Sequence, residues 1–290
     1  MDQPRPHFLD VASSVSGRPW VDRLDANAVR TATAIRQRTG LSEILARIVA
    51  ARGVGLDEAE TFLEPTVRDL MPDPSTLADM DRLAERLAKA ITDNDAVALF
   101  GDYDVDGASS VALMTRYLTH FGLKPQVHIP DRVFEGYGPN VGAIDKLIDN
   151  GAGLLITLDC GTTSDGPIAH ARGRGLDVLV IDHHLSDAEL PPATALVNPN
   201  RPDDLSGLGY LCAAGVTFMV LVATNRVLRQ RGGTGLPDLM TMIDLVALAT
   251  VCDVVPLKGL NRAFVARGLE VARAGRNRGI AALSLAARIN

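Results

Sequence analysis

Short runs of consecutive apolar residues alternate along the middle of the chain with stretches in which apolar residues recur every three or four positions. The apolar runs predict four strands, at 96–100, 126–130, 153–159 and 177–182. The periodic stretches between them predict helices at 108–121, 140–150 and 164–173. Because the strands are apolar on both faces, the expected fold class is α/β, with a mostly parallel sheet covered by helices on both faces.

The chain before this alternation is predicted to form a small helical region over residues 1–75. Residues 41–52 have the apolar spacing of a helix. Asp57, followed three residues later by Glu60, forms a capping-box pattern for a second short helix that ends before Pro65.

Helical spacing also flanks the alternation on both sides. A helix over 80–91 leads into the first strand, and two more are predicted at 210–230 and 239–250. We therefore expect the sheet domain to span residues 76–257. The remaining residues, 258–290, contain seven basic side chains and one acidic side chain.

Composition places the chain among ordinary globular proteins, because 47% of its 290 residues are hydrophobic and 22% are charged. Its three cysteines are widely spaced, which argues against a disulfide scaffold or a zinc ribbon and fits a reducing compartment. No apolar run reaches the roughly 18 residues of a membrane helix. The first ten residues also lack the apolar segment of a signal peptide, so we expect a cytoplasmic protein without membrane contact.

The net charge of −6 argues weakly against a nucleic-acid partner, because such proteins usually carry a basic surface. Six aspartates, however, lie in the candidate site described below, where divalent cations would offset their charge. The basic residues comprise 25 arginines and 4 lysines, and arginine suits bidentate contacts with phosphate. A general preference for arginine explains this imbalance equally well, so the charge leaves a nucleic-acid partner open.

The segment GDYDVDG at 101–107 places Asp102, Asp104 and Asp106 between a predicted strand and a predicted helix. Three carboxylates this close repel one another, and Mg²⁺ or Mn²⁺ would relieve the repulsion by accepting oxygen ligands. A solvated acidic turn or a calcium loop is the alternative. Because the segment lacks the later glutamate of an EF-hand and follows a strand, it favours a site for a divalent metal.

Further candidate residues end other apolar runs. Asp159 ends the third predicted strand, and Asp182, His183 and His184 end the fourth. A histidine pair beside an aspartate suits a metal ligand, a contact to phosphate or water, and a carboxylate that fixes an imidazole. Asp253 follows the apolar run of the last predicted helix. The alternatives are a helix cap at Asp159 and an arginine or helix terminus as the partner of Asp253.

These segments should converge, because the carboxyl ends of parallel strands lie at one edge of a sheet. Several carboxylates and an imidazole there would supply ligands for two divalent ions a few Å apart, an arrangement used to hydrolyse phosphate esters. Asp159, on the middle strand of the three, is the candidate to bridge both ions. Cys160 and Cys252 adjoin two of the aspartates and are expected to be buried residues that fill space.

Four segments in this order, GDYDVDG, LDCG, IDHH and ATVCDVVPL, resemble the DHH phosphoesterase superfamily and, within it, the RecJ-type single-strand-specific DNA exonucleases. The resemblance covers about residues 20–275, and its further segments are 62–91, 133–138, 197–203 and 253–269. It implies a metal-dependent enzyme that degrades single-stranded DNA from the 5′ end in recombination and repair. Single-stranded DNA is the implied partner, with a repair helicase or single-strand-binding protein as a further one.

The resemblance also implies roles for individual residues. Ligands for two divalent ions, Mn²⁺ or Mg²⁺, match Asp104, Asp106, Asp159, His183 and Asp253, with Asp102 as a further acid of the motif. The expected catalytic residues are Asp159, His184 near the scissile phosphate, and Asp182 as the acid that orients an imidazole. Many relatives have a histidine where this chain has Phe100, so one ion is expected to be held less tightly unless Asp102 substitutes.

The family continues into a second domain that closes the cleft and then into an oligonucleotide-binding domain. We therefore expect a chain truncated after its DHH domain, in which 258–290 resembles the helix that connects to the next domain. Two other functions stay open. One is a DHH phosphoesterase for short oligonucleotides, cyclic dinucleotides or pyrophosphate, and the other is a poorly active fragment or scaffold that binds metal and DNA.

Overall fold

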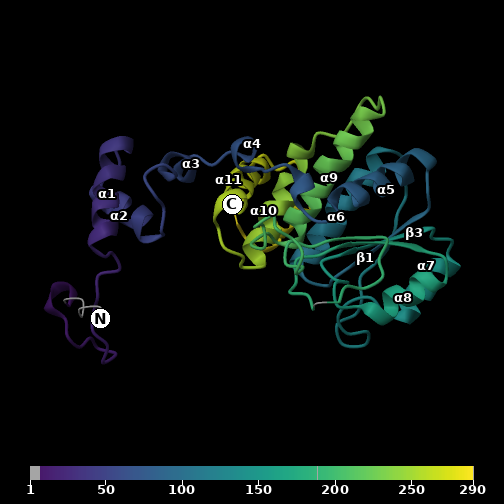
Figure 1. Cartoon of the computed structure of the whole chain (residues 1–290), viewed down its shortest axis with the longest axis horizontal. Helices are drawn as coiled ribbons and strands as arrows, with labels where there is room; N and C mark the ends of the chain where they lie inside the picture. The colour runs from purple at the N-terminus through teal and green to yellow at the C-terminus, as the bar shows by residue number, and fades with distance from the viewer. Residues whose placement is uncertain (1–6, 188, 290) are drawn as a thin grey trace. The chain divides into compact units, whose positions relative to one another are not determined.

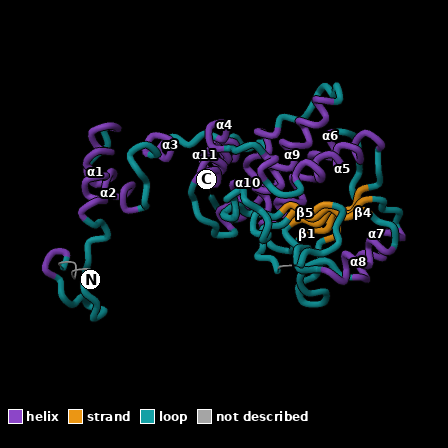
Figure 2. Tube along the Cα trace, viewed as in Figure 1, coloured by secondary structure: helices purple, strands orange, loops and turns teal. Residues whose placement is uncertain are grey.

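The structure, a computed structural model, describes residues 7–187 and 189–289. The chain forms two compact units, Met1–Pro65 and Thr66–Asn290. Figures 1 and 2 show that the described part of the first unit is built from helices and loops, whereas the second contains all the strands. The candidate site lies entirely in the second unit.

Three helices of the first unit enclose a small apolar core: α1 (Ala26–Thr39), α2 (Glu43–Ala51) and α3 (Ala59–Leu63). Asp25 caps α1 by accepting a hydrogen bond from the backbone N–H of Ala28, and Ser42 caps α2 in the same way. The apolar spacing predicts α2 but not α1, whose buried apolar residues are only Ala32 and Ile35.

The predicted capping box at the start of α3 is wrong. The helix begins at Ala59, and the residue before it makes no side-chain cap. Asp57 instead lies 3.0 Å from Arg38 of α1, and Glu60 lies 3.3 Å from the same guanidinium. The two carboxylates are thus drawn to an arginine that is distant in sequence, which no local pattern shows.

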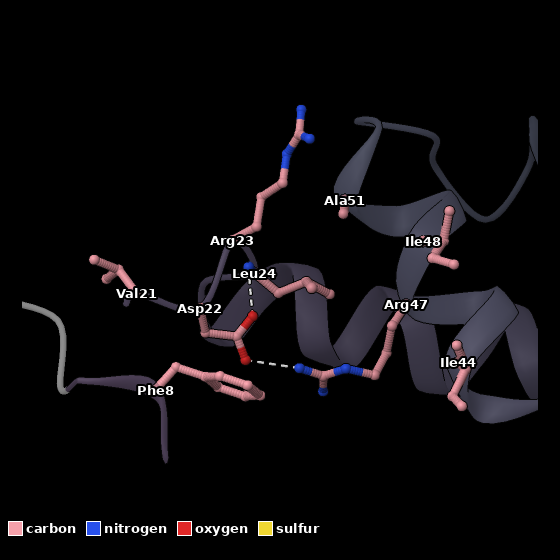
Figure 3. A pocket seen from close by; sticks show the side chains of 9 residues that line it. All are labelled: Phe8, Val21, Asp22, Arg23, Leu24, Ile44, Arg47, Ile48 and Ala51. Atoms are coloured by element: carbon pink, nitrogen blue, oxygen red, sulfur yellow. Dashed lines mark hydrogen bonds and ion pairs between the residues drawn. The ribbon is translucent and has the colours of Figure 1, made fainter. Parts of the chain in front are cut away.

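A pocket of about 310 Å³ lies on this unit, lined by residues of α2 and of the segment 21–24 (Figure 3). Ile44 and Ile48 form part of its apolar wall. Arg47 donates a hydrogen bond of 2.7 Å to Asp22 across it. The ion pair and the apolar wall together join the segment before α1 to α2.

The second unit is built on a five-stranded parallel sheet in the order β2-β1-β3-β4-β5. Its strands are β1 (Val97–Gly101), β2 (Gln126–His128), β3 (Leu154–Leu158), β4 (Asp177–Ile181) and β5 (Ala195–Val197). The four strands predicted from apolar runs are all present. The apolar pattern does not predict β5, a three-residue edge strand that pairs with β4 from Leu179 to Ile181.

Helices cover both faces of this sheet, as the α/β pattern predicts (Figures 1 and 2). Successive strand residues alternate between two cores. Leu99 and Ile156 pack with helices α5 (Met80–Asp93), α6 (Val105–His120) and α9 (Ala213–Gln230). Phe100 and Leu155 pack on the other face with α7 (Val141–Asp149) and α8 (Asp165–Gly173).

The remaining helices extend the larger core. They are α4 (Val67–Leu70), α10 (Ile243–Cys252), α11 (Gly259–Arg273) and α12 (Arg278–Ala286). The predicted helix at 239–250 divides into a short 3₁₀ helix, Leu239–Met242, and α10. Two further 3₁₀ helices span Phe8–Asp10 and Pro74–Thr76. Across the described ranges, no helix combines the length and the apolar character needed to cross a membrane.

The order of the strands positions the candidate site. β1 lies between β2 and β3, so the chain adds β2 on one side of β1 and then β3 on the other. In open α/β sheets such a reversal point, beyond the carboxyl ends of the strands, is where ligands bind. Asp102 follows β1 at this point, and Asp159 follows β3.

Close packing at the start of α6 provides a test of this geometry. A Cβ atom at Gly107 would lie 2.5 Å from the carbonyl oxygen of Asp102, so Gly107→Ala should destabilise the protein by about 1–3 kcal/mol. Gly166 of α8 is the matched control, because a Cβ there would meet nothing within 4 Å. Gly166→Ala should be neutral or stabilising by up to about 1 kcal/mol.

Urea denaturation of the two variants and the parent, all free of metal, measures both effects. Equal free energies of unfolding for the two variants would contradict the close approach of α6 to Asp102.

Candidate metal centre

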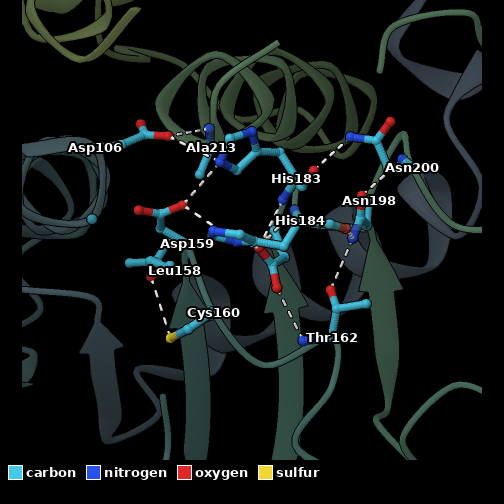
Figure 4. Close-up of polar contacts among 12 residues, drawn as sticks. Asp106, Leu158, Asp159, Cys160, Thr162, His183, His184, Asn198, Asn200 and Ala213 are labelled. Atoms are coloured by element: carbon cyan, nitrogen blue, oxygen red, sulfur yellow. Dashed lines mark hydrogen bonds and ion pairs between the residues drawn. The ribbon is translucent and has the colours of Figure 1, made fainter. Parts of the chain in front are cut away.

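Six aspartates and two histidines meet beyond the carboxyl ends of the central strands. Figure 4 shows four of them, Asp106, Asp159, His183 and His184. Asp102 and Asp104 follow β1, Asp106 lies in the first turn of α6, Asp159 follows β3, Asp182, His183 and His184 follow β4, and Asp253 follows α10. The parallel sheet and the helix ends thus bring together residues that are as much as 151 positions apart, from 102 to 253.

Asp159 is the most constrained of these residues. It is 1% exposed and has a φ angle of 63°, a left-handed conformation that is unfavourable for residues other than glycine. Neither of its carboxylate oxygens has a hydrogen-bond partner. Burial, and then the charges of Asp106 and Asp104, raise the pKa of Asp159 well above its usual range. A buried carboxylate without donors needs a proton or a cation to balance it.

Asp106 is also buried, but it has donors. Its two oxygens accept hydrogen bonds from the backbone N–H groups of Ala213 and Ala214, at 2.6 and 2.8 Å. These are the first residues of α9, where free N–H groups and the helix dipole favour a negative charge. Burial nevertheless raises the pKa of Asp106, against the opposing effects of His183 and these two hydrogen bonds.

The imidazole of His183 points its Nε2 atom at three carboxylates. Nε2 lies 3.3 Å from Asp159 Oδ1, 3.6 Å from Asp106 Oδ2 and 3.7 Å from Asp253 Oδ2. Its Nδ1 atom lies 3.1 Å from the carbonyl oxygen of Leu211. Because a carbonyl can only accept, Nδ1 carries a proton, and in the neutral imidazole the lone pair of Nε2 faces the carboxylates. Metal-binding histidines are commonly oriented in this way.

Asp182 is a buried carboxylate that, unlike Asp159, has several hydrogen-bond donors. It accepts hydrogen bonds from the backbone N–H groups of His183, His184 and Thr162 and from His184 Nδ1, the last at 2.8 Å. Burial alone would raise the pKa of Asp182, but the hydrogen bonds and charge of His184, with Thr162, lower it to about 2. In return, Asp182 raises the pKa of His184. Asp182 therefore stays ionised and fixes the imidazole of His184.

A second group of ligand atoms gathers around the loop after β1. Asp104 caps α6 by accepting a hydrogen bond of 2.9 Å from the N–H of Gly107. Asp102 is 4% exposed, and its Oδ1 atom has no hydrogen-bond partner. Burial and the charge of Asp104 raise the pKa of Asp102, although a backbone hydrogen bond to Tyr103 opposes them.

The side chains form three overlapping sets in which all ligand atoms lie within 4.8 Å of one another. They are Asp159–His183–His184, Asp106–His183–Asp253 and Asp102–Asp104–Asp159. Carboxylate oxygens suit both Mn²⁺ and Mg²⁺, whereas an imidazole nitrogen suits transition metals. Together with the unpartnered oxygens of Asp102 and Asp159, this donor set fits divalent cations.

Three residues that sequence reasoning did not single out complete the surroundings. The hydroxyl of Tyr137 lies 3.2 Å from His184 Nδ1. The amides of Asn198 and Asn200 donate hydrogen bonds to the carbonyl oxygens of His184 and His183, at 2.8 and 2.5 Å. All three lie in the stretches 133–138 and 197–203, noted above for their resemblance to exonucleases, but isolated polar residues in loops give no periodic signal.

The structure also places Cys160, Cys252 and Phe100, which adjoin or precede the candidate aspartates. Cys160 is buried as expected, but Cys252 is exposed, because it lies on the outer side of the last turn of α10. Phe100 is fully buried on the face covered by α7 and α8, with its ring centroid 5.1 Å from that of His128.

Comparisons with known proteins identify the domain that carries these residues. Residues 96–250, which include seven of the eight site residues, match the N-terminal domain of the DHH family. The single-stranded-DNA-specific exonuclease RecJ of Dickeya dadantii is 38% identical over 250 residues, which cover 84% of this chain and 43% of that protein.

Two solved structures are also similar. The crystal structure of an exonuclease RecJ bound to manganese has a TM-score of 0.65 and 32% identity, over 75% of this chain and 53% of that one. RecJ of Thermus thermophilus in complex with Mn²⁺ has a TM-score of 0.73 and 27% identity, over 89% of this chain and 36% of that one.

The chain spans 43% of the length of the curated RecJ relative from Dickeya dadantii. The matched domain contains the parallel sheet and, apart from Asp253, the carboxylates and histidines at its edge. With its matched domain covering 155 of 290 residues, this chain belongs to the DHH family.

Proposed function

We propose that the chain hydrolyses phosphodiester bonds in single-stranded DNA as an exonuclease, with two divalent ions, Mn²⁺ or Mg²⁺, at the edge of the sheet. The observation that carries this proposal is Asp159, whose two oxygens are buried and without partners. It shares one ligand set with His183 and another with Asp102 and Asp104. The similarity to exonucleases named for single-stranded DNA supports the substrate.

In this proposal each ion has its own ligands, except that Asp159 would serve both ions. Asp106, Asp159, His183 and Asp253 would hold one ion, and Asp102, Asp104 and Asp159 the other. When bound, two such ions stabilise charge on phosphoryl oxygens and favour loss of a proton from water. Asp106 keeps its orientation through the N–H groups at the start of α9, and His183 does so through Leu211.

His184 is the proposed catalytic residue closest to the scissile phosphate. Its side chain is 44% exposed, in contrast to the buried carboxylates beside it. Asp182 raises the pKa of His184, which favours the protonated imidazole near neutral pH. With Nδ1 donating to Asp182, Nε2 is free to donate a hydrogen bond to a phosphate oxygen. Asp182 acts by holding the imidazole in this orientation.

The wider setting follows from the similarity to RecJ and is proposed with it. We place the catalytic domain at 76–257, after the helical region 1–75, and take 258–290 to connect to the further domain of a longer protein. We propose digestion from the 5′ end in DNA recombination and repair, with a repair helicase or single-strand-binding protein as partner. Three free cysteines support a cytoplasmic location.

Removal of the charge at position 159 should abolish hydrolysis. Asp159→Asn preserves the shape of the side chain but weakens binding of both ions, so we expect kcat/KM on a single-stranded oligonucleotide with Mn²⁺ to fall about a thousandfold. That loss corresponds to about 4 kcal/mol of transition-state stabilisation.

The matched control is Asp145→Asn, which removes a carboxylate on α7 that contacts His170 and Arg174 instead of the metal centre. Its activity should stay within about twofold of the parent. Full activity in Asp159→Asn would refute the two-ion assignment.

Binding of Mn²⁺ should release protons. Burial raises the pKa of Asp159 and Asp106, so these carboxyl groups bind protons in the metal-free protein, and they must lose them to bind a cation. We therefore expect affinity for Mn²⁺ to increase as the pH rises from about 5 to about 8. Calorimetric titration in buffers of different ionisation enthalpy measures the number of protons released. A binding enthalpy that is the same in every buffer would contradict this expectation.

Digestion of 5′-blocked and unblocked oligonucleotides, with Mn²⁺ and with chelator, tests the direction and the class of substrate. We expect only the unblocked strand to be degraded, and only with metal. Degradation of dinucleotides or cyclic dinucleotides but not of long strands would favour the phosphoesterase alternative. Binding of Mn²⁺ and DNA without cleavage would favour a poorly active fragment or scaffold.

A further inference from the structure

Tyr137 occupies a loop that is built to hold it in one place. The loop lies between β2 and α7, and Tyr137 stands between Gly136 and Gly138, whose φ angles are 81° and 76°. These left-handed angles favour glycine and turn the chain sharply on both sides of the tyrosine. Asp131 closes the loop by accepting hydrogen bonds from the N–H groups at 133 and 134.

Glu135 ties the same loop to the rest of the unit. Its carboxylate accepts hydrogen bonds from the N–H of Asp131, at 3.0 Å, and from the side-chain amide of Asn140, at 3.3 Å. It also lies 2.9 Å from His128 Nε2, at the end of β2. The loop that carries Tyr137 is therefore tied to β2 and to the start of α7 by contacts outside the metal centre.

The hydroxyl of Tyr137 joins two strand ends. It lies 3.3 Å from the carbonyl oxygen of Asp159, which follows β3, and 3.2 Å from His184 Nδ1, which follows β4. The rings of Tyr137 and His184 meet edge to face, with centroids 5.6 Å apart. Because the carbonyl can only accept, the hydroxyl donates to Asp159 and receives a share of the Nδ1 proton, which also faces Asp182.

The hydroxyl of Tyr137 contacts Asp159 at its backbone, which has an unfavourable conformation. The residue has a left-handed φ of 63°, and its N–H group donates to Ile181 of β4 at 2.9 Å. The hydroxyl of Tyr137 holds the other end of the residue, at its carbonyl. The phenol of Tyr137 thus contacts both the backbone of Asp159, the proposed bridging carboxylate, and the imidazole of His184, which is proposed to contact phosphate.

We propose that Tyr137 is a positioning residue that sets Asp159 and His184 relative to each other. The expected effect of Tyr137 on catalysis rests on the proposed function. Its contacts to Asp159 and His184 are present in the chain without metal or DNA. The tyrosine contacts neither the metal ligand atoms of Asp159 nor, in this proposal, the reacting phosphate.

The test compares Tyr137→Phe with Tyr117→Phe, which are both removals of one phenol oxygen. Tyr117 is the control because its hydroxyl donates a hydrogen bond of 2.9 Å to Asn225 inside the helical core, away from the site. For Tyr137→Phe we expect kcat on a single-stranded oligonucleotide to fall about tenfold to a hundredfold, with KM within about twofold. Tyr117→Phe should leave both constants within about twofold and lower only thermal stability.

A second measurement needs no activity. Long-range ¹H–¹⁵N spectra of the metal-free protein report the protonation and hydrogen bonding of each imidazole, and the signals of His184 are assigned by their loss in His184→Gln. We expect the Nδ1 signal to shift in Tyr137→Phe and to stay unchanged in Tyr117→Phe. The affinity for Mn²⁺ should fall about tenfold in the first variant only.

The outcomes separate this inference from the proposed function. If the parent cleaves no DNA, the spectra and the Mn²⁺ affinities still decide whether Tyr137 positions the two residues. An unchanged His184 signal in Tyr137→Phe overturns the inference, even when the parent is a nuclease. Equal losses of kcat and thermal stability in the two variants also overturn it, because they would assign Tyr137 a purely structural role.

Discussion

The mutual repulsion of buried carboxylates is the constraint on which the rest of the site depends. Asp102, Asp106 and Asp159 are each at most 4% exposed, and all three converge on one end of a parallel sheet. Two unit charges 4 Å apart repel by about 4 kcal/mol at an effective dielectric constant of 20. Such a centre is stable only when protons or cations balance the charges. Burial raises the pKa of all three groups, and the charges of neighbouring carboxylates raise it further.

Hydrogen-bond partners, and not burial, distinguish the roles of these carboxylates. Asp159 and Asp182 end neighbouring strands and are both 1% exposed. Asp182 has donors from His183, His184 and Thr162, and its pKa falls to about 2. Asp159 has no donor on either oxygen, and its pKa rises. The carboxylate of Asp182 therefore holds a histidine, whereas the carboxylate of Asp159 is left for a cation.

The sequence predicted what depends on local pattern and missed what depends on distant contacts. Apolar runs identify β1 to β4, and aspartates at their ends place the candidate site. The edge strand β5 has three residues, too few for a periodic signal. The capping role expected of Asp57 failed because Arg38, distant in sequence, binds that carboxylate. Tyr137 reaches Asp159 and His184 from a loop, so only the folded chain shows its contacts.

Helix α9 connects the metal centre to the packing of the whole unit. Its first two N–H groups hold Asp106, and the carbonyl of Leu211, just before it, orients His183. The same helix is buried along most of its length against α5, α6 and the sheet. A small rotation of α9 would therefore move two proposed ligands of one ion together. Because close-packed protein cores resist such shifts, the apolar core around α9 maintains the geometry of the polar site. The residues that pack α9 are in this sense part of the metal centre, although none of them approaches an ion.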